Sequence, residues 1–124
     1  MPVRSLSSSV LAWPGKDRVE LALAAWALEL SARCDALLAV GFFGSYARGD
    51  WGVGSDLDLI VVLAQSQSPF GRRSVPVDTR ILPVPVDLLI YTLRELNEML
   101  KRGGRFPETL RAEAVWAWQR SNFP

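Results

Sequence analysis

Residues 41–63 read GFFGSYARGDWGVGSDLDLIVVL, and this stretch decides how the chain folds. It begins as an apolar run, passes through a glycine-crowded loop and ends with two aspartates that lead into a second apolar run. Apart from Asp58, residues 57–64 are all apolar, so both faces of an extended chain would be apolar, which predicts a strand covered on both faces. Asp56 and Asp58 are two residues apart, so on a strand they project from the same face. An isolated D-x-D pair is more often a turn cap with a solvated neighbour, and that alternative stays open.

The pair Gly44-Ser45 follows another apolar run, at residues 35–43. A strand followed by glycine, serine and a short helix leaves backbone N–H groups and a hydroxyl at the start of that helix, which suits a phosphate. Arg48 lies one turn further on and can lean toward the same anion. An ordinary turn is the alternative, and these residues alone favour neither.

Residues 17–33 predict a helix of about four turns upstream of this stretch. Its apolar positions recur at helical spacing and are expected in the core: Val19, Leu23, Trp26 and Leu30. Asp17 followed by Glu20 resembles a capping box at the start of the helix. Residues 1–9 are expected to be flexible, and residues 1–124 to form a single domain.

Downstream, residues 65–80 are polar and predict a loop with at most one helical turn. A third apolar run follows at 81–91, where two prolines move the start of the strand to about Val86. A short helix capped by Thr92 is expected at 93–101, with a further turn at 107–110. A strand is expected at about 114–118, and a helix there is the alternative. The chain therefore predicts an α/β (α+β) fold, a small mixed sheet of three to four strands with helices packed against it.

Asp87 is the only charge within the third apolar run. A carboxylate buried there would cost on the order of several kcal/mol if it were left unpaired. Placement beside Asp56 and Asp58 around a metal ion would remove that cost, and the alternative is that Asp87 caps an exposed strand end. Three carboxylates from two strands suit Mg²⁺ or Mn²⁺, which prefer oxygen ligands. The natural chemistry of such a site is phosphoryl or nucleotidyl transfer.

Composition narrows the chemistry further. The chain has no histidine, which excludes Ser-His and Cys-His catalysis and leaves acid–base and metal chemistry to carboxylates. Cys34 is the only cysteine, so no intrachain disulfide can form and a reducing, cytoplasmic location is expected. The formal charge of +1 gives no reason to expect direct nucleic-acid binding, and no stretch is long enough to span a membrane.

Gly44-Ser45, ten intervening residues and Asp56-Leu57-Asp58 match the pattern G-S-x10-D-x-D. Together with VDLLIY at residues 86–91, this segment resembles the minimal nucleotidyltransferases, small one-domain members of the DNA polymerase beta superfamily. The resemblance covers about residues 36–91 and implies a polymerase-beta-like fold. It also implies that Asp56, Asp58 and Asp87 bind the metal, with Asp87 as the base toward the acceptor hydroxyl. A nucleoside triphosphate would be held by Gly44, Ser45 and Arg48.

The resemblance implies a partner as well. Minimal nucleotidyltransferases are often paired with a small helical HEPN-domain protein as antitoxin and toxin, so we expect transfer of AMP from ATP to a tyrosine of that partner. Two other functions stay open: a catalytically idle module that neutralises its partner by binding, and transfer to a small hydroxylated molecule such as an antibiotic. The acceptor is expected to meet a partner or homo-oligomer surface, for which the candidates are Trp13, Trp51, Trp116 and Trp118.

Overall fold

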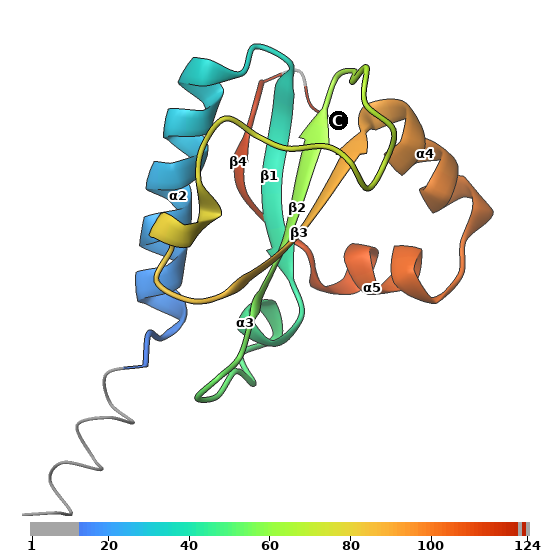
Figure 1. The fold of residues 1–124 in the computed structure, drawn as a ribbon. Helices are drawn as coiled ribbons and strands as arrows, with labels where there is room; N and C mark the ends of the chain where they lie inside the picture. The colour runs from blue at the N-terminus through green and yellow to red at the C-terminus, as the bar shows by residue number, and fades with distance from the viewer. Residues whose placement is uncertain (1–12, 122, 124) are drawn as a thin grey trace, which may run out of the picture.

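The computed structural model describes residues 13–121 and 123, and it is built around a four-stranded sheet (Figure 1). The strands are β1 (Leu37–Phe43), β2 (Leu57–Leu63), β3 (Val86–Thr92) and β4 (Val115–Gln119). Their order is β3-β2-β1-β4; β2 is parallel to β3, and β1 is antiparallel to β2 and β4. The predicted small mixed sheet of an α+β fold is confirmed. The expected flexibility of residues 1–9 falls outside the described residues.

Helices cover both faces of the sheet. The long helix α2 (Lys16–Arg33) lies on one face, and α4 (Leu93–Arg102) and α5 (Arg105–Glu113) lie on the other (Figure 1). The single turn α3 (Ser45–Arg48) follows β1 directly. Within the described residues, no helix is long and apolar enough to cross a membrane.

Strand β2 is buried on both faces, as its continuous apolar run predicts. Leu57, Leu59 and Val61 join the core under α2, which contains the four apolar positions predicted for that helix. Ile60 and Val62 point to the other side and pack with residues of α4 and α5. This alternation places every even-numbered residue of β2, Asp58 included, on the face that carries α4 and α5.

The predicted capping box at Asp17 and Glu20 is wrong. Helix α2 begins at Lys16, with Gly15 at the N-cap and no side-chain capping bond, and the N–H of Val19 donates to the Gly15 carbonyl at 3.0 Å. Asp17 is already inside the first turn, so its carboxylate cannot serve as the N-cap acceptor. Glu20 instead lies 3.7 Å from the Lys16 ammonium, one turn earlier.

The second half of the chain follows its prediction with one extension. Strand β3 begins at Val86, and Thr92 caps α4 in a full capping box with Glu95. The connector between β2 and β3 contains only a 3-10 turn, Thr79–Ile81. The turn expected at 107–110 is a longer helix, α5, which places Glu113 at its last position.

The four tryptophans proposed for a partner surface are half-buried and pack within the chain. The Trp13 indole N–H donates to the Tyr46 hydroxyl at 3.0 Å, and Trp51 stacks on the same ring with centroids 5.6 Å apart. Gly41 makes room for Trp116, because a Cβ there would lie 2.6 Å from the indole. Packing explains these rings, and a role in partner binding stays a prediction.

Candidate active site

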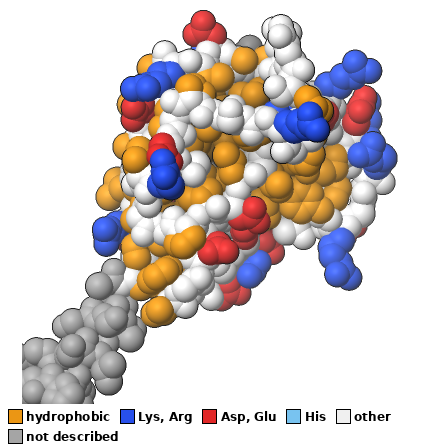
Figure 2. All heavy atoms as spheres, viewed as in Figure 1, with side chains coloured by type: hydrophobic (Ala, Val, Ile, Leu, Met, Phe, Trp, Pro, Cys, Tyr) orange, Lys and Arg blue, Asp and Glu red, His pale blue; other side chains and the backbone are white. Residues whose placement is uncertain are grey.

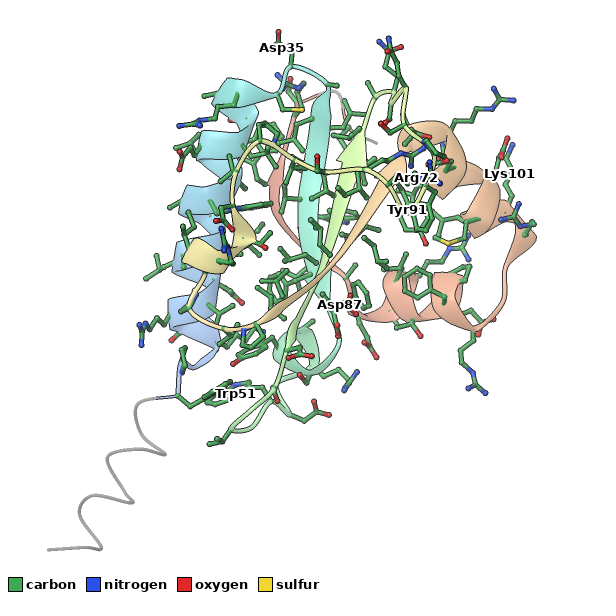
Figure 3. The ribbon with its side chains drawn as sticks, viewed as in Figure 1. Asp35, Trp51, Arg72, Asp87, Tyr91 and Lys101 are labelled. Atoms are coloured by element: carbon green, nitrogen blue, oxygen red, sulfur yellow. The ribbon has the colours of Figure 1, made fainter. Side chains whose placement is uncertain are left out.

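The first residues of β2 and β3 and the last residues of β1 meet at one end of the sheet, beside α3. Phe43 is the register partner of Asp58 in the antiparallel ladder, and Asp58 is the register partner of Asp87 in the parallel one. Residues directly opposite each other share a face, so both aspartates point to the side of the sheet that carries α4 and α5. Figure 3 shows Asp87 at this end of the sheet, and Figure 2 shows acidic side chains gathered there around a basic one.

Asp58 is the most constrained of the three predicted aspartates. It is half-buried and lies against the turn after β1, where a Cβ added to Gly44 would be only 2.2 Å from Asp58 Oδ2. The pKa of the Asp58 carboxyl is raised, first by burial and then by the charges of Asp87 and Asp56, while Arg48 opposes the rise. Asp58 therefore lies near enough to Asp56 and Asp87 to be repelled by both, and a cation beside Asp58 would relieve that repulsion.

Asp56 and Asp87 are more open to solvent. Asp56 is exposed and directly precedes β2. The expected burial of Asp87 is wrong, because β3 is an edge strand and the Asp87 side chain is exposed. Its position fits the alternative, a carboxylate at an exposed strand end, and it nevertheless stands next to Asp58 as the metal hypothesis requires.

The turn after β1 has the predicted strand–glycine–helix form. Gly44 has φ +78° and ψ −152°, a backbone conformation that residues other than glycine rarely adopt. Ser45 begins α3, and the turn closes where the Arg48 N–H donates to the Gly44 carbonyl at 2.9 Å. Glycine at this position serves two needs, the positive φ and the close approach of Asp58.

Glu113 is the residue that sequence reasoning missed. Its Oε1 accepts a hydrogen bond from the Gly44 N–H at 3.1 Å and another from Arg48 Nη1 at 3.1 Å. Arg48 also donates through Nε to Asp50 Oδ2 at 3.0 Å. Gly44 and Glu113 are 69 residues apart, so no local spacing or periodicity could have brought them together before the fold was known.

The residues at this end of the sheet fit a divalent cation by their chemistry. Among residues 13–121 and 123, no three His, Cys, Asp or Glu side chains converge closely enough to hold a metal ion by themselves. Mg²⁺ does not require such a cage, because it is commonly bound by one or two carboxylates together with waters and substrate phosphates. Asp58 and Asp87, paired in register, offer that smaller donor set.

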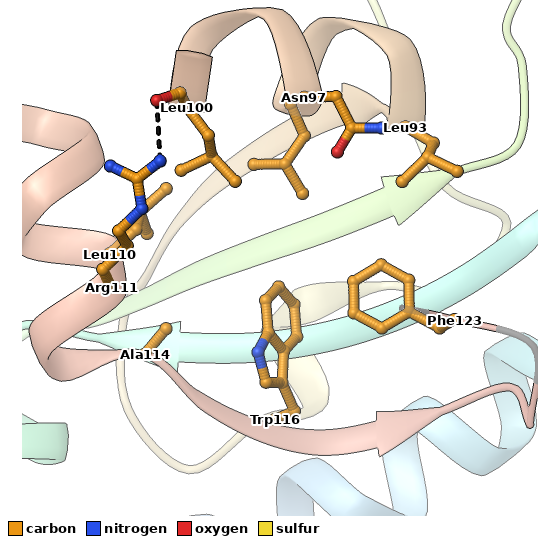
Figure 4. Close-up of a pocket in the computed structure, with 9 residues that line it drawn as sticks. Leu93, Asn97, Leu100, Leu110, Arg111, Ala114, Trp116 and Phe123 are labelled. Carbon is orange, nitrogen blue, oxygen red and sulfur yellow. Dashed lines mark hydrogen bonds between the residues drawn. The ribbon is translucent and has the colours of Figure 1, made fainter. Parts of the chain in front are cut away.

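A groove of about 360 Å³ lies between α4, α5 and β4 (Figure 4). It is lined mainly by apolar side chains from these elements, such as Leu96, Leu100 and Trp116. None of the three aspartates lines it. Its charged lining residue is Arg111, which donates to the Leu100 carbonyl at 2.7 Å, and among the described residues no carboxylate that could hold a metal ion lines it. The carboxylate end of the sheet is therefore the better candidate.

Two solved structures share the fold of this chain. The chain is similar to the solved structure of a candidate nucleotidyltransferase from Sulfolobus solfataricus, with 20% identity, 86% of each chain covered and a TM-score of 0.55. It is also similar to a chain in the crystal structure of a toxin–antitoxin with AMP-PNP, with 17% identity, 79% of this chain and 74% of that one covered, and a TM-score of 0.51. Identities this low show the fold alone. No curated protein matches the chain.

A family model provides the stronger link. The model for the nucleotidyltransferase domain matches residues 29–115, from the last turn of α2 to the first residue of β4. That span contains Gly44, Ser45 and the three aspartates, so the match covers the whole of the site described above. The chain therefore belongs to the nucleotidyltransferase domain family, in the DNA polymerase beta-like superfamily.

Proposed function

We propose that this chain is a metal-dependent enzyme that transfers AMP from ATP to a tyrosine hydroxyl of a HEPN-type toxin, and so acts as the antitoxin of a toxin–antitoxin pair. The observation that carries the proposal is the register pairing of Asp58 with Asp87, beside a glycine turn that Asp58 touches. A structural neighbour that is a toxin–antitoxin with AMP-PNP supports an adenine nucleotide and a protein partner.

The proposed reaction uses the two halves of the site for different tasks. Gly44, Ser45 and Arg48 would hold the triphosphate. Asp58 and Asp87 would hold Mg²⁺ or Mn²⁺ together with waters and the phosphates, and Asp56, directly before β2, would join them as the third predicted ligand. When bound, the metal would neutralise charge that develops on the phosphate oxygens. The acceptor hydroxyl oxygen bonds to the α-phosphorus as the bond from that phosphorus to the bridging oxygen breaks and pyrophosphate leaves. The hydroxyl proton passes to Asp87, whose exposed carboxylate is open to an incoming acceptor.

The test is transfer of labelled AMP from ATP, in the presence of Mg²⁺, to a small helical HEPN-domain protein, read as labelling and as a rise in intact mass. Asp56→Asn and Asp87→Asn should each lower transfer by at least about 100-fold, because the general base and the metal ligands are lost. Asp35→Asn is the matched control. Asp35 is exposed and lies at the opposite end of the sheet, so this variant should transfer AMP at the normal rate (Figure 3). Circular dichroism should be the same for all variants, and chelation of the metal should stop transfer.

Each other outcome has a distinct meaning. Full transfer by both aspartate variants would overturn the assignment of the site. Neutralisation of the partner without any change of mass would favour a module that acts by binding alone. Labelling of a small hydroxylated molecule, with none on the partner, would keep the enzyme and change the acceptor.

A further inference from the structure

Glu113 occupies the two groups that the proposed function assigns to the triphosphate. Its Oε1 accepts from both the Gly44 N–H and the Arg48 guanidinium, each at 3.1 Å, and its side chain is only 21% exposed. A carboxylate oxygen and a phosphate oxygen are acceptors of similar size and charge. The Glu113 carboxylate, an anion of the chain itself, is thus already bound to the groups proposed to bind phosphate.

The charges around Glu113 leave little room for a further anion. The negative groups at this end of the sheet are Asp50, Asp56, Asp58, Asp87 and Glu113. Arg48 is the basic group that pairs with two of them, Asp50 and Glu113. Arg48 therefore has no full positive charge to offer a phosphate while both carboxylates stay in place.

Glu113 can leave without rearranging the fold. It is the last residue of α5, where the backbone N–H of the following Ala114 already donates to Leu110, so the helix end does not depend on the Glu113 side chain. Its carboxylate is reached through three rotatable bonds and is partly open to water. Rotation of this side chain alone would free the Gly44 N–H and one side of Arg48.

We propose that Glu113 is an affinity-determining residue of the nucleotide site. In the free protein its carboxylate occupies the phosphate-binding groups, the Gly44 N–H and the Arg48 guanidinium, and the terminal phosphates of the nucleotide must displace it. This inference rests on the proposed function, because it takes Gly44 and Arg48 as the phosphate-binding groups. It goes beyond that function in naming a competitor built into α5, the helix that also lines the apolar groove.

The test is calorimetric titration of the full chain with ATP, inorganic tripolyphosphate and adenosine, with Mg²⁺ present. Glu113→Gln keeps the shape of the side chain and removes its charge, so ATP and tripolyphosphate should bind roughly 10-fold more tightly than to the unaltered chain. Adenosine, which has no phosphate, should bind equally to both. Glu108→Gln is the matched control, because Glu108 is an exposed acid on the same helix and should leave all three affinities unchanged.

Glu113→Ala provides a second variant, and urea unfolding shows whether either variant remains folded. Tighter binding of both phosphate ligands to either folded variant supports the proposal. Unchanged or weaker binding to both folded variants overturns it, and weaker binding would identify Glu113 as a group that assists the nucleotide. If neither the unaltered chain nor any variant binds ATP or tripolyphosphate, the proposed function falls together with this inference.

Discussion

Replacing Gly44 with alanine should damage both the stability of the fold and the site, for two separable reasons. The backbone at Gly44, with φ +78° and ψ −152°, is one that a residue with a Cβ adopts at a cost of about 1–3 kcal/mol. The new Cβ would also lie 2.2 Å from Asp58 Oδ2, so the carboxylate must move, which adds about 1–3 kcal/mol by analogy with overpacked cores. The expected loss in the free energy of unfolding is therefore about 2–6 kcal/mol.

Gly103→Ala is the matched control for the backbone cost. Gly103 has nearly the same conformation, with φ +71° and ψ −170°, and a Cβ there would meet nothing within 4 Å. The free energy of unfolding of Gly103→Ala should fall only by the cost of the strained backbone, about 1–3 kcal/mol. Equilibrium unfolding in urea measures the loss of stability in both variants. AMP transfer should be abolished in Gly44→Ala and retained in Gly103→Ala.

A double-mutant cycle assigns the remaining difference to Asp58. In an Asp58→Ala background the carboxylate is absent, so the cost of Gly44→Ala should fall to that of Gly103→Ala. The reasoning is refuted if Gly44→Ala costs no more than Gly103→Ala. It is equally refuted if removal of the Asp58 carboxylate brings no relief.

Two further predictions concern the stability of the fold. Arg73 pairs with Glu95 in a two-bond contact, and this pairing lowers the pKa of Glu95 to about 2. Because the pKa of Glu95 is lower in the folded than in the unfolded chain, the ion pair stabilises the fold above pH 4.5, and this stabilisation is lost as the pH falls toward 2. The Glu95 side chain is 35% exposed, so we expect the pair to contribute about 1–2 kcal/mol to the free energy of unfolding. The Glu95→Gln variant should lack this pH-dependent contribution. Tyr46→Phe should cost about 1–3 kcal/mol in urea unfolding, because the buried hydroxyl accepts from Trp13 and donates to the Pro14 carbonyl; an unchanged midpoint would contradict this.

Local patterns in the sequence were sufficient for most elements of the fold. The continuous apolar run of β2, the prolines before β3 and the N-cap at Thr92 each act on neighbouring residues, and the structure confirms all three. The Asp17 capping box failed for a local reason, since α2 begins at Lys16, directly after Gly15, and places Asp17 inside the first turn. The short turn at α3 and the spacing of Asp56 and Asp58 were likewise visible in the order of residues alone.

Tertiary structure decided how these pieces meet. No spacing in the sequence shows that Asp58 and Asp87 become register partners, that β3 is an edge strand with Asp87 exposed, or that Asp58 lies against Gly44. Glu113 is the clearest case, because its contacts with Gly44 and Arg48 cross 69 and 65 residues and depend on how α5 packs on the sheet. Periodicity and turn chemistry depend on neighbours along the chain, whereas the electrostatics of this site depend on strand register and helix packing, which only the folded chain determines.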